Sequence, residues 1–262
     1  MTFSKLDLLQ VAVIISSAIL LCAFAVAKPE PGYYYELKIY HLKTSAQEQR
    51  MENYLKGAYL PALHRAGIKN VGVFRPVEKD SLPVIYVYIP VRTLQVFSTL
   101  NNTLKKDKQY QVDGKDYLDA SYDNAPYQRI QTILLKAFEG MPFPAVPELK
   151  SPKEERVYEL RSYEGPTEKY YANKVQMFNK GEVDLFKRLG FNTMFYSEVL
   201  AGSSMPNLMY MTCFDNKASR DDHWKAFSAD SVWKRLSSMP EYQNNVSKNT
   251  ITFLRPATYS DF

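Results

Sequence analysis

The chain repeats one sequence pattern at a long and nearly constant spacing. Residues Tyr35–Tyr40 read YELKIY and residues Tyr158–Tyr163 read YELRSY, an offset of 123 residues (158 − 35). Near the ends of the two copies, Leu135 matches Leu254 at a slightly shorter offset of 119 residues (254 − 135). Solenoid repeats have periods of only about 20–50 residues. A period this long therefore indicates a duplicated domain.

Both copies predict the element order β-α-β-β-α-β. The first unit spans residues 34–138 and the second spans residues 156–260, and a proline-rich linker at 139–155 separates them. This order is typical of an α+β ferredoxin-like unit, whose antiparallel sheet carries both helices on one face. The other face of each sheet would be bare. We therefore expect the two tandem units to pack sheet to sheet.

Three details refine this prediction. In the first unit, Gly57 and Pro61 should interrupt the first helix, because proline removes a hydrogen bond and crowds the preceding turn. The second helix is expected at about 91–103. A polar stretch, 105–126, leads to the last strand, which is expected at about 127–137.

Residues 1–27 have the pattern of a signal peptide. A short basic start precedes a mostly apolar run, which ends in Ala25-Val26-Ala27. We predict cleavage between Ala27 and Lys28 and export to the periplasm or the medium. The apolar run is shorter than the ~20 residues that a membrane span needs, so we expect no stable span after cleavage. The alternatives are a membrane anchor through the uncleaved segment or through a lipidated Cys22.

Composition argues against several functions. The net charge is +5, from 33 basic and 28 acidic residues, and the basic residues form no stripe, which argues against nucleic-acid binding. The chain has 3 histidines, and none has the spacing of a metal-ligand set. We therefore expect neither a metal nor a cofactor. After cleavage Cys213 would be the one remaining cysteine, and its apolar surroundings predict a buried thiol.

The first strands of the two units each carry an acid, a base and a tyrosine on one face. Side chains alternate along a strand, so these residues should point the same way. They are Glu36, Lys38 and Tyr40 in the first unit and Glu159, Arg161 and Tyr163 in the second. We expect the apolar face to lie under the helices and the polar face to point toward the other sheet. The polar residues would then form ion pairs between the sheets or line a ligand cavity.

The second unit resembles the NIPSNAP family. The resemblance covers about residues 156–260 and rests on several spaced motifs. These are Val157–Tyr163, Leu189–Phe191, Asp222–Phe227, Trp233, Phe253–Pro256 and Tyr259-Ser260. It implies the dimeric α/β-barrel superfamily, here built within one chain. That superfamily includes monooxygenases, isomerases and members without known activity. It supplies no catalytic motif that transfers residue by residue, and the export signal is typical of a bacterial member.

Three functions fit these patterns. The first is binding of a small, partly apolar molecule in the barrel cavity, with Arg161 holding an anionic group. The second is a cofactor-poor enzyme of the monooxygenase or isomerase type, for which His41 or Glu159 would be the general base. The third is a structural or protein-interaction role with a filled barrel. We expect a binding protein rather than an enzyme, either a monomer with pseudo-dimeric symmetry or a homodimer.

Overall fold

Eight strands close into one barrel within the part of the chain that the structure describes. The computed structural model describes residues 32–78 and 82–262, so the predicted signal segment, its cleavage site and Cys22 lie outside the described residues. The strands follow one another around the barrel as β1-β3-β2-β8-β5-β7-β6-β4, and each neighbouring pair is antiparallel. Their bounds are β1 (Tyr34–His41), β2 (Gly72–Pro76), β3 (Val84–Val91), β4 (Arg129–Ala137), β5 (Val157–Glu164), β6 (Asn192–Ala201), β7 (Asn207–Phe214) and β8 (Lys248–Pro256).

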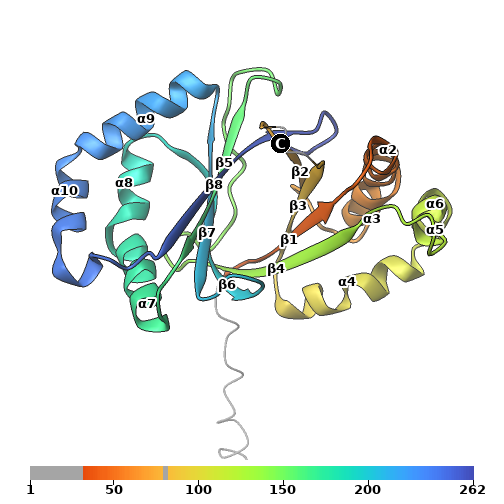
Figure 1. Cartoon of the computed structure of the whole chain (residues 1–262), viewed down its shortest axis with the longest axis horizontal. Helices are drawn as coiled ribbons and strands as arrows, with labels where there is room; N and C mark the ends of the chain where they lie inside the picture. The colour runs from red at the N-terminus through yellow and green to blue at the C-terminus, as the bar shows by residue number, and fades with distance from the viewer. Residues whose placement is uncertain (1–31, 79–81) are drawn as a thin grey trace, which may run out of the picture. The chain divides into compact units, whose positions relative to one another are not determined.

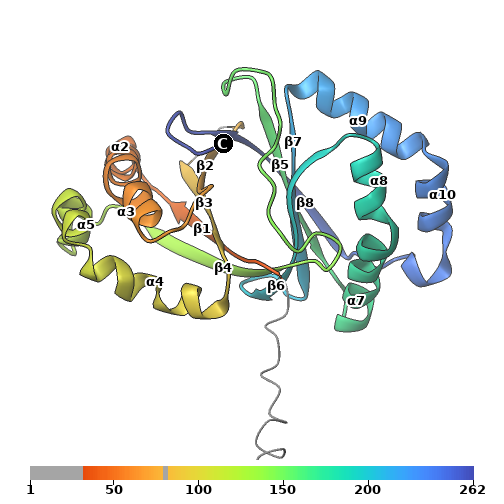
Figure 2. The ribbon, with the colours of Figure 1, turned by 180° about the vertical axis from the view of Figure 1, so that it is seen from behind.

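Helices cover the outside of the barrel in two groups (Figures 1 and 2). One group packs on the strands of the first unit and the other on the strands of the second. The first group is α2 (Ser45–Tyr54), the π-helical turn η1 (Leu55–Tyr59), α3 (Leu60–Arg65), α4 (Leu94–Lys106), α5 (Lys108–Asp113) and α6 (Lys115–Leu118). The second is α7 (Glu168–Met177), the π-helical turn η2 (Phe178–Glu182), α8 (Val183–Arg188), α9 (Lys217–Ala229), α10 (Ser231–Ser238) and the 3₁₀ turn η3 (Pro240–Tyr242). No helix in the described ranges has the length and apolar character that crossing a bilayer would require.

The duplicated fold is confirmed, and the elements keep the spacing of the sequence repeat. β5 begins 123 residues after β1 (157 − 34), and α9 begins 123 residues after α4 (217 − 94). The last strands, β4 and β8, begin 119 residues apart (248 − 129). Each unit therefore has the sheet order of a ferredoxin-like domain, and the two sheets join edge to edge into one barrel.

Two details differ from the sequence prediction. The predicted interruption near Gly57 is a π-helical turn at Leu55–Tyr59, and an equivalent turn recurs in the second unit without a nearby proline. The stretch 105–126 holds α5 and α6, which the sequence prediction did not include. Asp107 caps α5 by accepting a hydrogen bond from the backbone of Tyr110, and the Tyr110 ring is buried.

The predicted orientation of the first strands was wrong. Tyr35, Leu37 and Ile39 point into the barrel, where they join a core that takes side chains from all eight strands. Tyr40 belongs instead to the core between the first sheet and its helices. In a closed barrel both faces of a strand are covered, so the more apolar face does not have to lie under the helices. The polar residues of β1 and β5 therefore lie between sheet and helix, not between the sheets.

One end of the barrel interior is filled with aromatic rings. Tyr35, Phe74, Tyr88 and Tyr158 are each at most 1% exposed there. Phe262 packs among them, with its ring centroid 6.1 Å from those of both Phe74 and Tyr88. The backbone holds this segment in place, since Val73 donates to the Ser260 hydroxyl at 3.0 Å.

The hydroxyl of Tyr88 offers a test of this packing. It is buried and has no hydrogen-bond partner among the described residues. Such a group costs stability, so Tyr88→Phe should raise the free energy of unfolding by about 1 kcal/mol. Urea denaturation measures this change. The matched control is Tyr122→Phe, which alters a residue that is 98% exposed and should leave stability unchanged. A destabilised Tyr88→Phe protein would mean that the hydroxyl has a partner in solution.

Candidate functional site

A pocket of about 240 Å³ lies between the second sheet and its helices. Both charged side chains and aromatic rings line it. Its lining comes from β5, β7, α7, η2, α8, α9 and α10 and consists of Arg161, Tyr163, Lys174, Glu182, Phe186, Tyr210, Trp224, Phe227, Ser228 and Trp233. Five charged residues are buried in the part of the chain that the structure describes, namely Glu36, Glu159, Arg161, Lys174 and Glu182. All but Glu36 lie in or directly behind this pocket.

Glu159 organises the charges behind the pocket. It is fully buried, and its Oε1 accepts from Arg161 Nε at 2.6 Å. Its Oε2 accepts from Arg220 Nε at 2.7 Å and from Trp224 Nε1 at 3.0 Å. Burial alone would raise the pKa of Glu159, but the hydrogen bond from Arg220 and the charges of Arg161 and Arg220 lower that pKa below its usual value. A carboxylate held so firmly in its ionised form, with its oxygens already occupied, is a poor general base.

Arg161 is held in place from three sides. Its guanidinium carbon lies 3.7 Å from the ring centroid of Trp224. Its Nη1 donates to the Tyr163 hydroxyl at 2.9 Å, while Nε and Nη2 face Glu159. Arginine has five N–H groups, so Nη1 and Nη2 each keep a second N–H that finds no acceptor within residues 32–78 and 82–262. These remaining donors are available to a ligand.

The hydroxyls of Tyr163 and Tyr210, beside Arg161, carry two protons, and one of these donates no hydrogen bond to a described residue. The hydroxyls of Tyr163 and Tyr210 lie 2.9 Å apart, so one of their two protons fills the bond between them. Among the described residues, the second proton has no acceptor, because the other contact of Tyr163 is with a donor, Arg161. Burial raises the pKa of Tyr210 well above its usual value, so the phenol stays protonated. The pair therefore supplies one more unused donor.

Lys174 and Glu182 form a buried ion pair across the pocket. They are 7% and 2% exposed, and Lys174 Nζ donates to Glu182 Oε1. Burial raises the pKa of Glu182, and the charge of Lys174 offsets this rise only in part. Lys174 Nζ also lies 4.8 Å from the ring centroid of Phe178. Glu182 is the last residue of η2, and π-helical turns frequently occur at functional sites.

Lys174 and Glu182 were not identified as site residues from the sequence, although their positions on an apolar helix stripe pointed to them. Tyr171, Phe178 and Leu185 recur at helical spacing in the sequence and mark the apolar stripe of this helix. Lys174 lies three residues after Tyr171 and Glu182 lies four residues after Phe178, so both charges fall on that stripe. A charge on the buried face of a helix is expensive unless it is paired. That pattern should have marked both positions.

The equivalent space in the first unit is filled. Glu36 and Lys38 form an ion pair at 3.4 Å, and Lys38 Nζ lies 5.6 Å from the ring centroid of Tyr59. The offset of 123 residues pairs Tyr59 of the first unit with Glu182 of the second (182 − 59). It likewise pairs Met51 with Lys174 (174 − 51). Tyr59 and Met51 are both buried. Further tyrosines fill this region, namely Tyr40, Tyr54, Tyr110, Tyr117 and Tyr127.

The structure thus divides the predicted site residues into separate groups. Arg161 and Tyr163 line the pocket of the second unit, and Glu159 lies directly behind it. Glu36, Lys38 and Tyr40 lie in the filled region of the first unit. His41 is the last residue of β1 and is not part of the pocket lining. No three His, Cys, Asp or Glu side chains gather into a potential metal site within residues 32–78 and 82–262.

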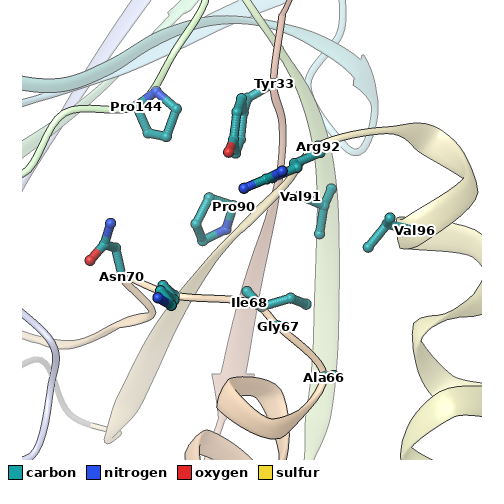
Figure 3. Close-up of a pocket in the computed structure, with 11 residues that line it drawn as sticks. Tyr33, Ala66, Gly67, Ile68, Asn70, Pro90, Val91, Arg92, Val96 and Pro144 are labelled. Carbon is teal, nitrogen blue, oxygen red and sulfur yellow. The ribbon is translucent and has the colours of Figure 1, made fainter.

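A larger cleft of about 530 Å³ lies on the first unit (Figure 3). Its walls come from the end of α3, the end of β3 and the linker. Tyr33 and Arg92 lie beside each other on one wall, with Asn70 and Pro144 on the other side (Figure 3). Arg92 and Asn70 are exposed. Water and salt would screen a charge bound there, so the buried pocket of the second unit is the stronger candidate site.

Comparison with known families places the pocket inside a recognised domain. A family model described as NIPSNAP matches residues 158–261. This range contains every residue that lines the pocket. No curated protein matches the chain.

Solved structures share the whole barrel. A putative monooxygenase from Lactobacillus acidophilus NCFM matches with a TM-score of 0.55 and 11% identity, over 86% of this chain and 94% of that chain. A putative monooxygenase from Fusobacterium nucleatum has a TM-score of 0.55 and 8% identity, over 87% and 94% of the two chains. A mutant chlorite dismutase from Candidatus Nitrospira defluvii, in complex with cyanide, has a TM-score of 0.51 and 9% identity, over 89% and 94%. Identities this low establish a shared fold only.

The Glu159 network predicts a specific dependence of stability on pH. Glu159→Gln leaves two arginines without their buried anion, so at neutral pH it should lower the free energy of unfolding by about 3–5 kcal/mol. Because its pKa is lowered in the folded state, Glu159 stabilises the fold fully above its ordinary pKa of 4.5, and this contribution is lost as the pH falls through the lower, folded-state pKa. The difference in the free energy of unfolding between wild type and Glu159→Gln should therefore become smaller at acid pH.

Chemical denaturation over a series of pH values measures this gap. The control is Glu164→Gln on the same strand, which removes a partly exposed ion pair with Lys248. It should change stability by at most about 1 kcal/mol. A gap for Glu159→Gln that stays constant through the acid range would contradict the lowered pKa.

Proposed function

From the NIPSNAP domain at residues 158–261 and the pocket that it contains, we propose that the protein binds a small, partly apolar anion. One observation carries the proposal: the unused hydrogen-bonding groups of the pocket are mostly donors. They come from Arg161, from Lys174 and from the pair formed by Tyr163 and Tyr210. An anion is the partner that accepts from several such donors at once.

The remaining walls favour an apolar body on this anion. Trp224, Phe227 and Trp233 line the pocket together with Phe186. Aromatic rings bury large apolar areas and favour flat ligands that stack or pack edge to face. The pocket of about 240 Å³ has room for a ligand about as large as a single aromatic ring with a carboxylate. We therefore propose a small aromatic or alicyclic carboxylate as the ligand class.

One feature supports the alternative of a cofactor-poor enzyme. Glu182 lines the pocket, and its pKa is raised by burial. A carboxyl group tuned in this way is suited to proton transfer. Neither His41 nor Glu159, the bases that the sequence suggested, has a comparable position. If the protein is an enzyme, we propose Glu182 as its acid or base.

Benzoate is a suitable probe of the binding proposal. The chain has 2 tryptophans, Trp224 and Trp233, and both line the pocket, so tryptophan fluorescence reports on its occupation. We expect benzoate to change the fluorescence saturably. Benzamide has the same shape without the charge and should bind at least about tenfold more weakly, because hydrogen bonds to charged groups contribute more.

Variants localise the binding. The double variant Tyr163→Phe/Tyr210→Phe removes both hydroxyls and with them the unused proton, so it should weaken benzoate binding about fivefold. Lys174→Met should weaken it about tenfold or more, while Lys180→Met, at an exposed position of the adjoining turn, should have no effect. Equal binding of benzoate and benzamide, or unchanged affinity in both pocket variants, would refute an anion site.

We also propose that the protein acts after export. The charged start, the apolar run and the Ala25-Val26-Ala27 sequence support this. Intact-mass measurement of the exported protein from a bacterial host should give a chain that begins at Lys28. An exported chain that keeps residues 1–27 would favour the anchored form instead.

A further inference from the structure

A second pocket, of about 190 Å³, opens at the mouth of the barrel. It lies at the end away from Phe262, and along β5 the barrel interior changes from aromatic to polar toward this end. On β5 the inward positions run from Tyr158 through Leu160 to Ser162, and Leu160 and Ser162 both line the pocket. This pocket belongs to the interior of the barrel and is separate from the site between the second sheet and its helices.

The floor of this pocket is apolar. Ile39, Ile133, Leu160 and Met209 form it, and they belong to the buried core of the barrel. They come from both halves of the chain, since the first two lie on β1 and β4 and the others on β5 and β7. The floor therefore exists only because the barrel is closed.

The wall is rich in hydroxyl and amide groups. It contains Gln131, Ser162, Ser203, Ser204, Asn207, Thr250 and Thr252. Asn207 is 3% exposed, and its Nδ2 donates to Ser162 Oγ at 2.8 Å. The second N–H of this amide has no acceptor among the residues that the structure describes. Thr252 makes no hydrogen bond from its hydroxyl within the described ranges, so this wall offers unused groups that both donate and accept.

The two charged residues that line this pocket have opposite charge and neutralise each other. Glu164 and Lys248 are its charged lining residues, and they form an ion pair with 3.3 Å between Oε1 and Nζ. A bond between Gln131 and Ser203 ties the β6–β7 loop to the first half of the chain and holds that wall in place. In contrast to the cationic pocket of the second unit, nothing here favours an anion.

From this arrangement we propose that the barrel mouth binds a small, uncharged, polyhydroxylated molecule, such as a monosaccharide or a cyclic polyol. The C–H face of the ligand packs on Leu160 and Met209. Its hydroxyls donate to and accept from Asn207, Ser162 and Thr252. An apolar floor beside an uncharged wall that carries both hydrogen-bond donors and acceptors is suited to such a ligand.

Saturation-transfer NMR with myo-inositol and D-glucose as probes tests the proposal on the full chain. We expect at least one of them to receive saturation from the protein and, where both do, each to be displaced by an excess of the other. Thr252→Val removes one hydroxyl at nearly constant shape and should weaken binding about three- to tenfold. Asn207→Leu should weaken it about tenfold or more, and if this variant does not fold, Thr252→Val decides alone.

Two controls make the result specific. Thr132→Val alters a threonine on the outward face of β4 and should leave binding unchanged. Trp233→Ala alters the pocket of the second unit and should weaken benzoate binding without affecting the polyol. The proposal is overturned if neither probe receives saturation, if Thr252→Val binds like wild type, or if Trp233→Ala abolishes the polyol signal.

Discussion

Two seams of backbone hydrogen bonds determine what the rest of the structure can do. At one seam β2 pairs with β8, and at the other β4 pairs with β6. Without them, each unit would be an open sheet with helices on one face and an unprotected apolar surface on the other. The seams turn that surface into a shared core to which all eight strands contribute. They also leave the space between each sheet and its helices as the place where the two units differ.

The sequence contained enough information for the fold but not for the orientation of its strands. The repeat predicted the number, order and spacing of the strands and the main helix of each crossover, because each unit carries the same alternation and the same helix stripes. The alternation along β1 and β5 also identified which residues share a face. It could not show which face lies inward, because both faces of a barrel strand are covered and neither is solvated. Glu159 is fully buried on the side where an apolar residue was expected.

Of the residues that form the candidate site, only those on the strand β5 were predicted from the sequence. Arg161 and Tyr163 stood out because the first unit repeats their pattern. Lys174 and Glu182 lie on a helix that also contains a π-helical turn, and this turn adds a residue to the local register. Both charges fall on the apolar stripe of that helix, which points to their burial, but their pairing with each other depends on the local geometry of the turn, which the stripe does not describe. The unused donors of the pocket depend in the same way on distances that only the folded chain defines.

The two units share one fold but differ in what fills the space between the sheet and its helices. Tyrosines occupy the space in the first unit, whereas the second unit keeps a pocket with four buried charges in or behind it. Two identical subunits could not differ in this way, because every substitution in one would also appear in the other. Joining the halves in one chain removed that constraint, so one half can serve as a rigid support while the other carries the polar network.

The covalent connection between the halves has a further consequence. A barrel assembled from two separate chains comes apart when its concentration falls below the dissociation constant of the pair. Here the linker near Pro144 keeps both sheets at a high local concentration whatever the dilution of the protein. The shared core of this barrel, and the pocket at its mouth, therefore persist in surroundings where the protein is scarce and its molecules rarely meet.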